Sequence, residues 1–303
     1  MRILLLPALV VLAASPVLAQ ETPPEPQGIC VDLAKSLGFV DATKDSKFED
    51  VPDGCHATNF FVNFGPYTRY SVADIVIRSP DLFSGKFDFD VEPEDFELPA
   101  AVEITLTGFT FAPETGSALN DYIIEIQSEP MDIHFDYSWD KPTGTFNLND
   151  LSVRGFNDSL IALAAKASGF DKTPTDFDRV DDLPGAIEEL TFTLQDARFF
   201  SVMASPGVIA SLPSDGDPRA IVASYQQAAV EVVTGLPDGT ISDDSKAALT
   251  TLINSFPRLR GDYRFHLEAN PAVPFHKLLL DDLSDGLKLL SSFKLDVTHQ
   301  PAD

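Results

Sequence analysis

The stretch MDIHFDYSWD, residues 131–140, decides the fold class of this 303-residue chain. Five apolar side chains alternate in it with five polar ones, so a strand over these residues presents one apolar face and one polar face. This pattern is typical of an antiparallel strand that packs on a core with one face and meets water with the other. The turn KPTG, residues 141–144, follows directly and predicts a hairpin to a strand that begins near Phe146.

The same alternation continues on both sides of this stretch, over a strand-rich region from about 57 to 170. After Gly108 the apolar phase slips by one residue, and a similar slip separates Leu148 from Leu151. We predict a β-bulge or bend at each slip, because one extra residue in a strand shifts the faces of all that follow. The further strands predicted in this region cover 87–91, 102–106, 122–127 and 157–168, the last of which is also rich enough in Ala to be a helix.

The segment before the strands contains both cysteines. Apolar residues at helical spacing predict a short helix that starts at Cys30 and ends before Gly38. The acidic segment 41–54 lacks the oxygen spacing and central Gly of a calcium loop, so we predict a solvated loop. Cys30 and Cys55 lack the spacing of a metal or redox pair, and we predict a structural disulfide between them. Closing a loop of about 26 residues stabilises a fold by roughly 3 kcal/mol.

Helical periodicity dominates after a linker rich in Asp and Pro at 171–184. Strands framing helices predict an α+β fold, a bent and mostly antiparallel β-sheet with amphipathic helices packed on its apolar face. We expect a single body over 30–303, strand-rich at 57–170 and helix-rich with framing strands at 186–299. The strands are predicted at 190–194, 263–267 and 293–297, and the helices at 199–212 (broken near Ser205), 217–233 (capped by Asp217), 242–256 (capped by Ser242) and 275–290.

The N-terminus has the features of a secretory signal peptide. Arg2 precedes an apolar run of about a dozen residues, and small residues occupy the third and first positions before a cleavage point after Ala19. The run is shorter than the roughly 20 residues that cross a bilayer, and Pro7 interrupts it. We therefore expect removal of the signal peptide at 1–19, a flexible lead-in at 20–29, and export of a soluble protein without a membrane span to the periplasm.

The charge of the chain limits its partners. Its 47 acidic residues exceed the 21 basic ones and give a formal net charge of -26, which repels nucleic acid and anionic membranes. A hydrophobic content of 44% with 23 Phe is enough for a folded core. The sequence contains no nucleophile elbow, HExxH helix, Walker loop or dinucleotide fingerprint, so no catalytic residue, cofactor or metal ligand is assigned.

Two rows of polar residues are candidates for chemistry. Asp132, His134 and Asp136 place an imidazole and two carboxylates on one face of a strand, close enough to share a cation. A solvated sheet face in such an acidic protein produces the same triplet readily, and we favour that interpretation. A second row on another strand fits a salt-bridged surface in the same way: Arg264, His266 and Glu268.

A resemblance rests on three runs: NLNDLSVRGFNDSLIALAAKASGF at 147–170, IEELTFTLQDARFF at 187–200 and GDYRFHLEANPAVPF at 261–275. They resemble uncharacterised exported β-rich envelope proteins of Gram-negative bacteria and, more distantly, AsmA-like proteins. The resemblance covers roughly 143–275 and implies repeated strands that build a long sheet with an apolar inner face. The chain lacks the N-terminal membrane anchor of AsmA-like proteins and is short, and the resemblance assigns no functional residue.

The Phe-rich apolar face leads to three hypotheses of function. The first is a non-enzymatic periplasmic envelope protein that binds an apolar, lipid-like ligand or a protein partner where helices leave this face uncovered. The second is a metal-dependent or other hydrolase that uses Asp132, His134 and Asp136. The third is a structural assembly factor of the cell envelope, recognised through its sheet edge. A cavity under the helices would favour the ligand, and a filled core would favour the partner.

Overall fold

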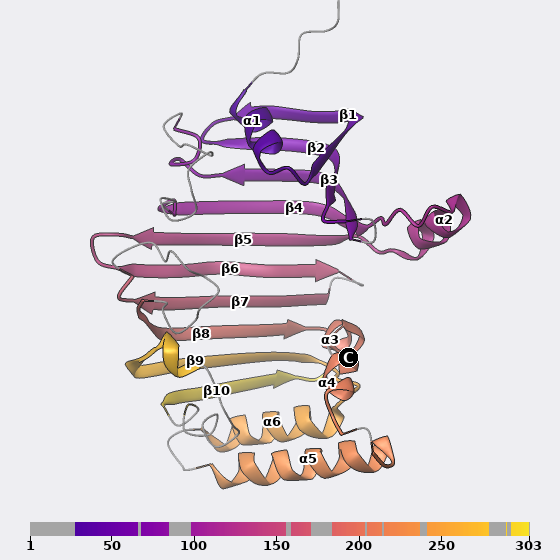
Figure 1. The fold of residues 1–303 in the computed structure, drawn as a ribbon. Coiled ribbons are helices and arrows are strands. Elements are labelled where there is room, and N and C mark those ends of the chain that lie inside the picture. The colour runs from indigo at the N-terminus through magenta and orange to yellow at the C-terminus, as the bar shows by residue number, and fades with distance from the viewer. Residues whose placement is uncertain are drawn as a thin grey trace, which may run out of the picture.

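A computed structural model describes residues 28–65, 68–84, 98–155, 159–170, 184–203, 205–213, 215–236, 241–278, 289 and 292–302. In this part of the chain, ten strands form one antiparallel sheet whose spatial order follows the sequence order (Figure 1). The strands are β1 (Val40–Val51), β2 (Gly54–Asn63), β3 (Arg69–Arg78), β4 (Ala101–Phe111), β5 (Met131–Asp140), β6 (Thr145–Gly155), β7 (Ser159–Ser168), β8 (Ala186–Gln195), β9 (Asp262–Pro274) and β10 (Phe293–Gln300).

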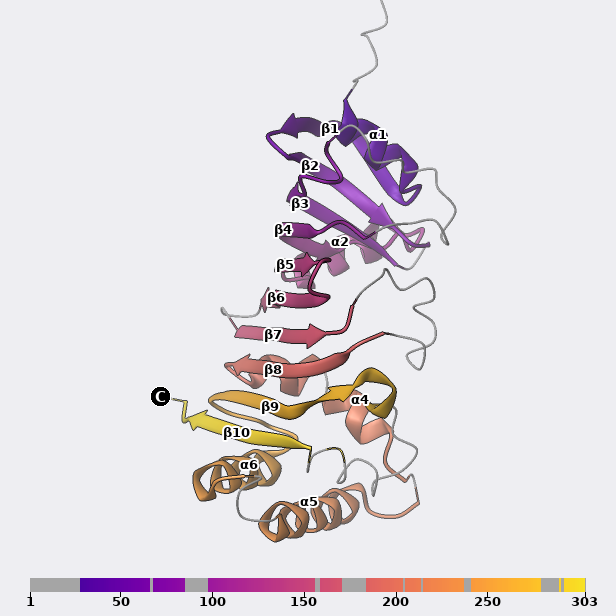
Figure 2. The ribbon, with the colours of Figure 1, turned by 90° about the vertical axis from the view of Figure 1, so that its left-hand side faces the viewer.

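The described helices contact mainly the two ends of this sheet, while α2 projects from one side of it (Figures 1 and 2). One helix contacts β1 and β2, and the last four form a group beside β8, β9 and β10. The predicted β-rich α+β class is thus confirmed. The helices are α1 (Ile29–Ser36), α2 (Ala118–Gln127), α3 (Arg198–Met203), α4 (Ser205–Ala210), α5 (Pro218–Gly235) and α6 (Asp243–Ser255), with a 3-10 turn η3 (Phe275–Leu278).

Both slips in the apolar phase are irregularities in strand pairing. The register between β4 and β5 shifts between Leu106 and Phe109, and that between β6 and β7 shifts between Leu148 and Leu151. Gly108 lies inside the first shift with a φ of 66°, and a Cβ on it would lie 2.8 Å from the Cβ of Ala73. Glycine therefore suits this bulge both for its backbone angle and for the space it leaves.

Several local predictions are confirmed. The turn at 141–144 joins β5 to β6, and residues 159–168 form a strand rather than a helix. The carboxylate of Asp217 accepts a hydrogen bond from the Arg219 N–H and caps α5, while the Ser242 hydroxyl caps α6. These side chains satisfy backbone N–H groups that have no partner inside the helix.

Two predictions are wrong. The segment 41–54, predicted as a loop, is mostly strand β1, because an edge strand exposed to water needs few apolar residues. The segment 122–127, predicted as a strand, belongs to α2, since the chain from Leu119 onward also fits a helical period. The predicted signal peptide at 1–19, the strand at 87–91, nearly all of the linker at 171–184 and most of the helix at 275–290 lie outside the described residues.

At the first end of the sheet, α1 contacts β1 and β2 (Figure 2). The predicted disulfide joins Cys30 in this helix to Cys55 in β2, with their Cα atoms 5.1 Å apart. Asp50 in β1 accepts hydrogen bonds from the backbone N–H of Cys30 at 2.8 Å and of Ile29 at 3.3 Å. A carboxylate at the N-terminus of a helix is favourable both as a hydrogen-bond acceptor and for its charge. Nearby, Ala57, Phe60 and Val72 form a buried cluster.

The other edge of the sheet is covered by the start of α6. Ile241 forms a parallel bridge with Leu295 of β10. The buried Ser245 hydroxyl donates to the carboxylate of Asp296 at 3.1 Å and accepts from the backbone N–H of Val297 at 2.9 Å. Backbone groups on the open side of β10 are thus paired, which removes part of the template that an edge strand offers to other chains.

Candidate functional site

One face of the sheet carries apolar rows that run across most of its strands. Directly paired residues from β3 to β10 form a row of eight, each an aliphatic or Phe side chain. A parallel row from β3 to β9 lies beside it. The first row is Ile77, Ile104, Phe135, Leu151, Leu163, Phe192, Phe265 and Val297, and the second is Ile75, Leu106, Ile133, Val153, Ile161, Leu194 and Tyr263.

These rows lead into an apolar cavity between the sheet and the group formed by α3, α4, α5 and α6. Its volume is about 440 Å³. Val208 of α4 and Tyr225 of α5 line it and are 45% and 51% exposed, so the cavity opens to solvent between these helices. The remaining lining residues are Phe192 and Leu194 of β8, Phe265 of β9, Phe200, Leu212, Val222, Gln226, Ala229, Leu252, Ile253, Phe256 and Leu259.

Gln226 is the one amide among these lining residues, and its N–H groups are already used. Its Nε2 donates to the backbone carbonyl of Ile253 at 2.8 Å and to that of Phe256 at 3.0 Å. Carbonyls at the C-terminus of a helix have no intrahelical partner, so this amide ties α5 to the end of α6. The lining includes no carboxylate, imidazole, thiol, amine or guanidinium. It can therefore hold an apolar molecule, but it offers no acid, base or strong nucleophile.

Beyond the cavity, the apolar rows are half-buried in the middle of the sheet. Ile133 and Phe135 are partly exposed, and Leu151 is 38% exposed. Among the described residues, no helix packs extensively on β3, β4, β5 or β6. The apolar surface thus continues from the cavity across the central strands.

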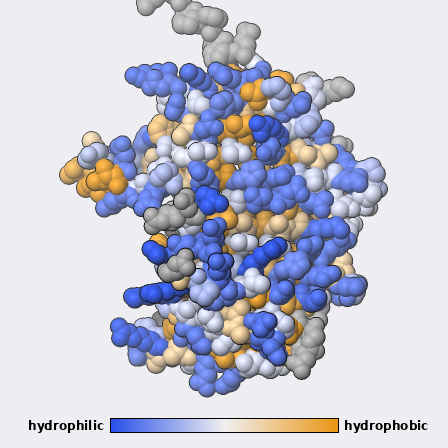
Figure 3. Space-filling model, turned by 180° about the vertical axis from the view of Figure 1, so that it is seen from behind, coloured by the Kyte–Doolittle hydropathy of each residue, from blue (hydrophilic) through white to orange (hydrophobic). Residues whose placement is uncertain are grey.

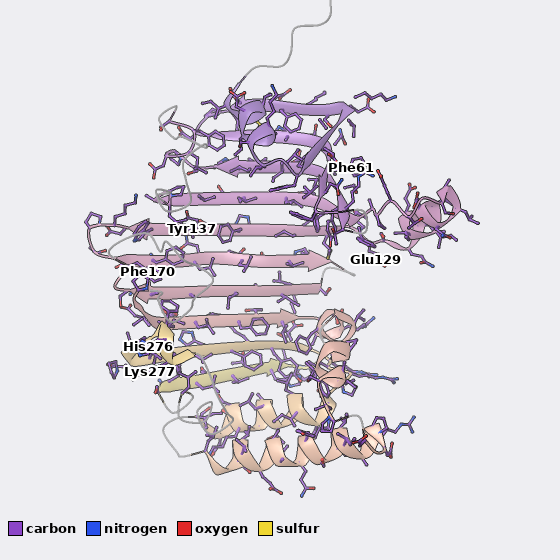
Figure 4. The ribbon with its side chains drawn as sticks, in the orientation of Figure 1. Phe61, Glu129, Tyr137, Phe170, His276 and Lys277 are labelled. Atoms are coloured by element: carbon purple, nitrogen blue, oxygen red, sulfur yellow. A yellow bond between two sulfur atoms is a disulfide. The ribbon has the colours of Figure 1, made fainter. Side chains whose placement is uncertain are left out.

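Aromatic rings extend this surface at one end of the strands. The ring of Tyr137 lies 5.3 Å from that of Phe146, which lies 5.4 Å from Phe170, which lies 5.4 Å from Phe275. Figure 4 shows Tyr137 and Phe170 at the same end of the sheet. The Tyr137 hydroxyl donates to the carbonyl of Pro99, and burial, assisted by the charge of Asp81, raises the pKa of Tyr137 to about 12.

The opposite face of the sheet is predominantly hydrophilic (Figure 3). It carries Asp132, His134 and Asp136, but each of them has a different partner. The Asp132 carboxylate accepts from the backbone N–H of Gly108 at 2.9 Å, and that of Asp136 accepts from the Asn149 amide at 3.1 Å.

His134 in turn lies beside two other residues. Its Nδ1 is 3.2 Å from the Thr105 hydroxyl, and its Nε2 is 4.0 Å from a carboxylate oxygen of Asp150. Within the described part of the chain, no group of three or more His, Cys, Asp or Glu could hold a metal ion. Asp132, His134 and Asp136 therefore fit a hydrogen-bonded sheet surface better than a shared cation site.

The other polar candidates have local partners too. His266 lies 3.1 Å from the Thr191 hydroxyl and 3.6 Å from Glu189, while His56 lies 2.7 Å from Asp74. The buried Ser205 hydroxyl donates to the carbonyl of Pro257. The Thr191 hydroxyl and the Glu189 carboxylate approach the same nitrogen of His266, Nδ1, whereas a catalytic triad places the hydroxyl and the orienting carboxylate on opposite ring nitrogens.

Comparison with models of known protein families found no match, and comparison with curated protein sequences found none either. Among the described helices, none is long and apolar enough to cross a membrane.

Sequence reasoning directed attention to the apolar face but did not find the cavity. Its lining residues come from segments up to about 70 positions apart, so local periodicity cannot bring them together. One signal was available in α5, where Val222, Tyr225, Gln226 and Ala229 have the spacing of a single helical face.

Proposed function

We propose that this chain is an exported, non-enzymatic protein of the bacterial envelope that binds an apolar, lipid-like ligand. The cavity between β8, β9 and the helices α3–α6 carries this proposal. Its volume of about 440 Å³ falls within the roughly 300–1,000 Å³ range of ligand pockets, and its lining is almost entirely hydrocarbon and aromatic. A ligand that enters it exchanges water for apolar contacts on nearly every side.

The ligand is elongated in this proposal. The half-buried rows that lead from the cavity to Leu151 and Phe135 provide a path for a chain longer than the cavity itself. Amphipathic helices packed on the apolar face would cover one end of this path, and the central strands would leave the rest accessible. The AsmA-like resemblance agrees with such an arrangement, since it implies a long sheet with an apolar inner face.

The periplasm is the proposed location. The predicted signal peptide at 1–19 supports export, and the disulfide between Cys30 and Cys55 fits an oxidising compartment. The hydrolase hypothesis has weaker support, because Asp132, His134 and Asp136 lie on the polar face with separate partners.

The test uses two neighbouring alanines of α5 as a matched pair. Ala229 lines the cavity, whereas Ala228 is exposed. Replacing either with Phe adds the same side chain to the same helix, but only Ala229→Phe fills the cavity. The purified mature protein is extracted to remove bound lipid, and a fluorescent fatty acid is titrated into each variant.

We expect wild type and Ala228→Phe to bind the fluorescent fatty acid with equal affinity. Ala229→Phe is expected to raise Kd by about tenfold or more, since ligand and side chain then compete for the same volume. Mass spectrometry of the extract is expected to show an acyl-chain lipid. Absence of both co-purified lipid and fatty-acid binding in folded wild type would refute the proposal, as would equal binding by both variants.

A further inference from the structure

Helix α2 projects from one side of the sheet, at the ends of β4 and β5, with an apolar stripe facing solvent. Leu119 is 67% exposed, Tyr122 58%, Ile126 64% and Ile123 38%. Figure 1 shows α2 standing away from the strands, and Figure 3 shows a hydrophobic patch on the projecting part of the molecule. These four residues form the α2 stripe.

The α2 stripe has the spacing of a face that packs against something. Its members lie at positions i, i+3, i+4 and i+7, which places them on one side of the helix. No residue of α2 is buried, and no other described element packs extensively against it. Within the described residues, the stripe therefore has no intramolecular partner of any extent.

Polar contacts at its N-terminus hold this helix in place. The Ser117 hydroxyl accepts from the Asn120 N–H, and the Asp121 carboxylate accepts from both the N–H and the hydroxyl of Thr115, at 2.9 and 2.6 Å. A helix of ten residues is marginal in water unless something stabilises it. The chain thus keeps a helix formed while its apolar side remains exposed, as expected for a preformed binding element.

The charges around the stripe indicate what kind of surface it fits. The sequence has no Lys or Arg between Lys86 and Lys141, while Asp121, Glu125 and Glu129 lie on or beside α2. Figure 4 shows Glu129 near the base of the helix. Helices that lie on membrane surfaces usually carry Lys or Arg on their polar side, which α2 lacks. A second copy of this acidic chain would bring like charges together.

We propose that the α2 stripe docks into an apolar groove of a partner protein whose rim carries Lys or Arg. The stripe would supply the buried anchors, and Glu125 and Glu129 would face the basic rim. This site is independent of the proposed ligand cavity, because α2 contributes no residue to that cavity.

The test begins with a photo-reactive amino acid at Ile123 in the full chain, expressed in its own host. The protein joined at this position is identified, purified alone and titrated against the purified chain. Two double variants form a matched pair. Leu119→Ser with Ile126→Ser removes two stripe residues, and Asn120→Ser with Gln127→Ser changes two exposed polar residues of the same helix.

We expect the stripe variant to raise Kd by about 100-fold or more, since each central apolar anchor typically contributes tenfold or more. The Asn120 and Gln127 variant is expected to bind like wild type. Added salt and Glu125→Lys are both expected to weaken binding, because the rim is basic. All variants should keep the Tm and the fatty-acid affinity of wild type, which separates this result from the fate of the proposed ligand site.

Three results would overturn the proposal. The first is a stripe variant whose affinity and cross-linking equal those of wild type. The second is stripe-dependent flotation with vesicles of phosphatidylcholine and phosphatidylglycerol, which would make the occupant a membrane. The third is self-association in sedimentation that the stripe variant abolishes, which would make it a second copy.

Discussion

Helices lie at both ends of the sheet, and each end has a buried apolar cluster. We call the β10 end the hollow end because an apolar cavity adjoins its cluster, and the β1 end the filled end. At the β1 end, α1 is joined to β2 by the disulfide, and the cluster of Ala57, Phe60 and Val72 is almost completely buried. At the β10 end, four helices form a group without a disulfide, and a cavity of about 440 Å³ lies between this group and β8 and β9. The α5 helix there has no buried residue at all.

This difference suggests a division of roles along one continuous sheet. Close packing gives an end its stability, because each void forfeits dispersion contacts on one side. A hollow end forgoes part of that stabilisation and gains space for a ligand. The filled end is therefore expected to respond to mutation through stability, and the hollow end through binding.

The largest expected effect is a loss of stability in two Phe→Ala variants, one at each end of the sheet. Phe60 is 4% exposed in the filled cluster, and Phe60→Ala is expected to lower the free energy of unfolding by about 3–5 kcal/mol. Phe256 already faces the cavity, so Phe256→Ala removes fewer contacts and should cost about 1–2 kcal/mol. Urea denaturation of both variants checks this. Equal losses would show that the two ends are packed alike.

The disulfide is expected to stabilise the fold slightly less than the Phe60 side chain does. Replacing Cys30 and Cys55 together with Ala opens a loop of about 26 residues and should cost about 3 kcal/mol. The affinity for a fluorescent fatty acid should not change, because the cavity lies at the other end of the sheet. Thermal unfolding and ligand titration measure the two effects. A large loss of binding in the still-folded variant would contradict the separation of roles.

Ser245 is expected to stabilise the edge of the sheet at the hollow end. Ser245→Ala leaves the Val297 N–H and the Asp296 carboxylate without their buried partner, and should cost about 1–3 kcal/mol. Ser224→Ala on exposed α5 serves as the control, with an expected change below about 0.5 kcal/mol. If the open side of β10 also becomes available to other chains, light scattering will show aggregation of Ser245→Ala before unfolding.

How far the sequence could predict this fold depends on how much each element relies on distant partners. Apolar and polar residues alternate so regularly over 131–140 that the apolar face of this strand was predictable. The bulges at Gly108 and near Leu148 were visible in the sequence as slips in this alternation. Strand β1 was missed because it contains few apolar residues, and its pairing with β2 compensates for that. Pairing across strands is not visible in a local pattern.

Helix α2 was missed for a different reason. A short run such as Tyr122 to Gln127 fits both a strand and a helix, and the capping by Ser117 and Asp121 decides between them. The apolar face of the sheet was predictable as a place for function. The cavity was not, since it depends on how four helices meet two strands.

The smallest effect at neutral pH is expected from Tyr137, which lies between the two ends. Its pKa is raised to about 12 in the folded protein, so the neutral phenol is favoured by folding. This contribution is fully present below about pH 10, the pKa of an exposed Tyr, and is lost as the pH rises toward 12. Tyr137→Phe should lower the free energy of unfolding by about 1 kcal/mol at pH 7, because it removes the hydrogen bond to Pro99. This difference from wild type should shrink above pH 10. Tyrosinate absorbance should lose part of its late rise near pH 12 in this variant, whereas a loss confined to the rise near pH 10 would mean that Tyr137 is open to solvent.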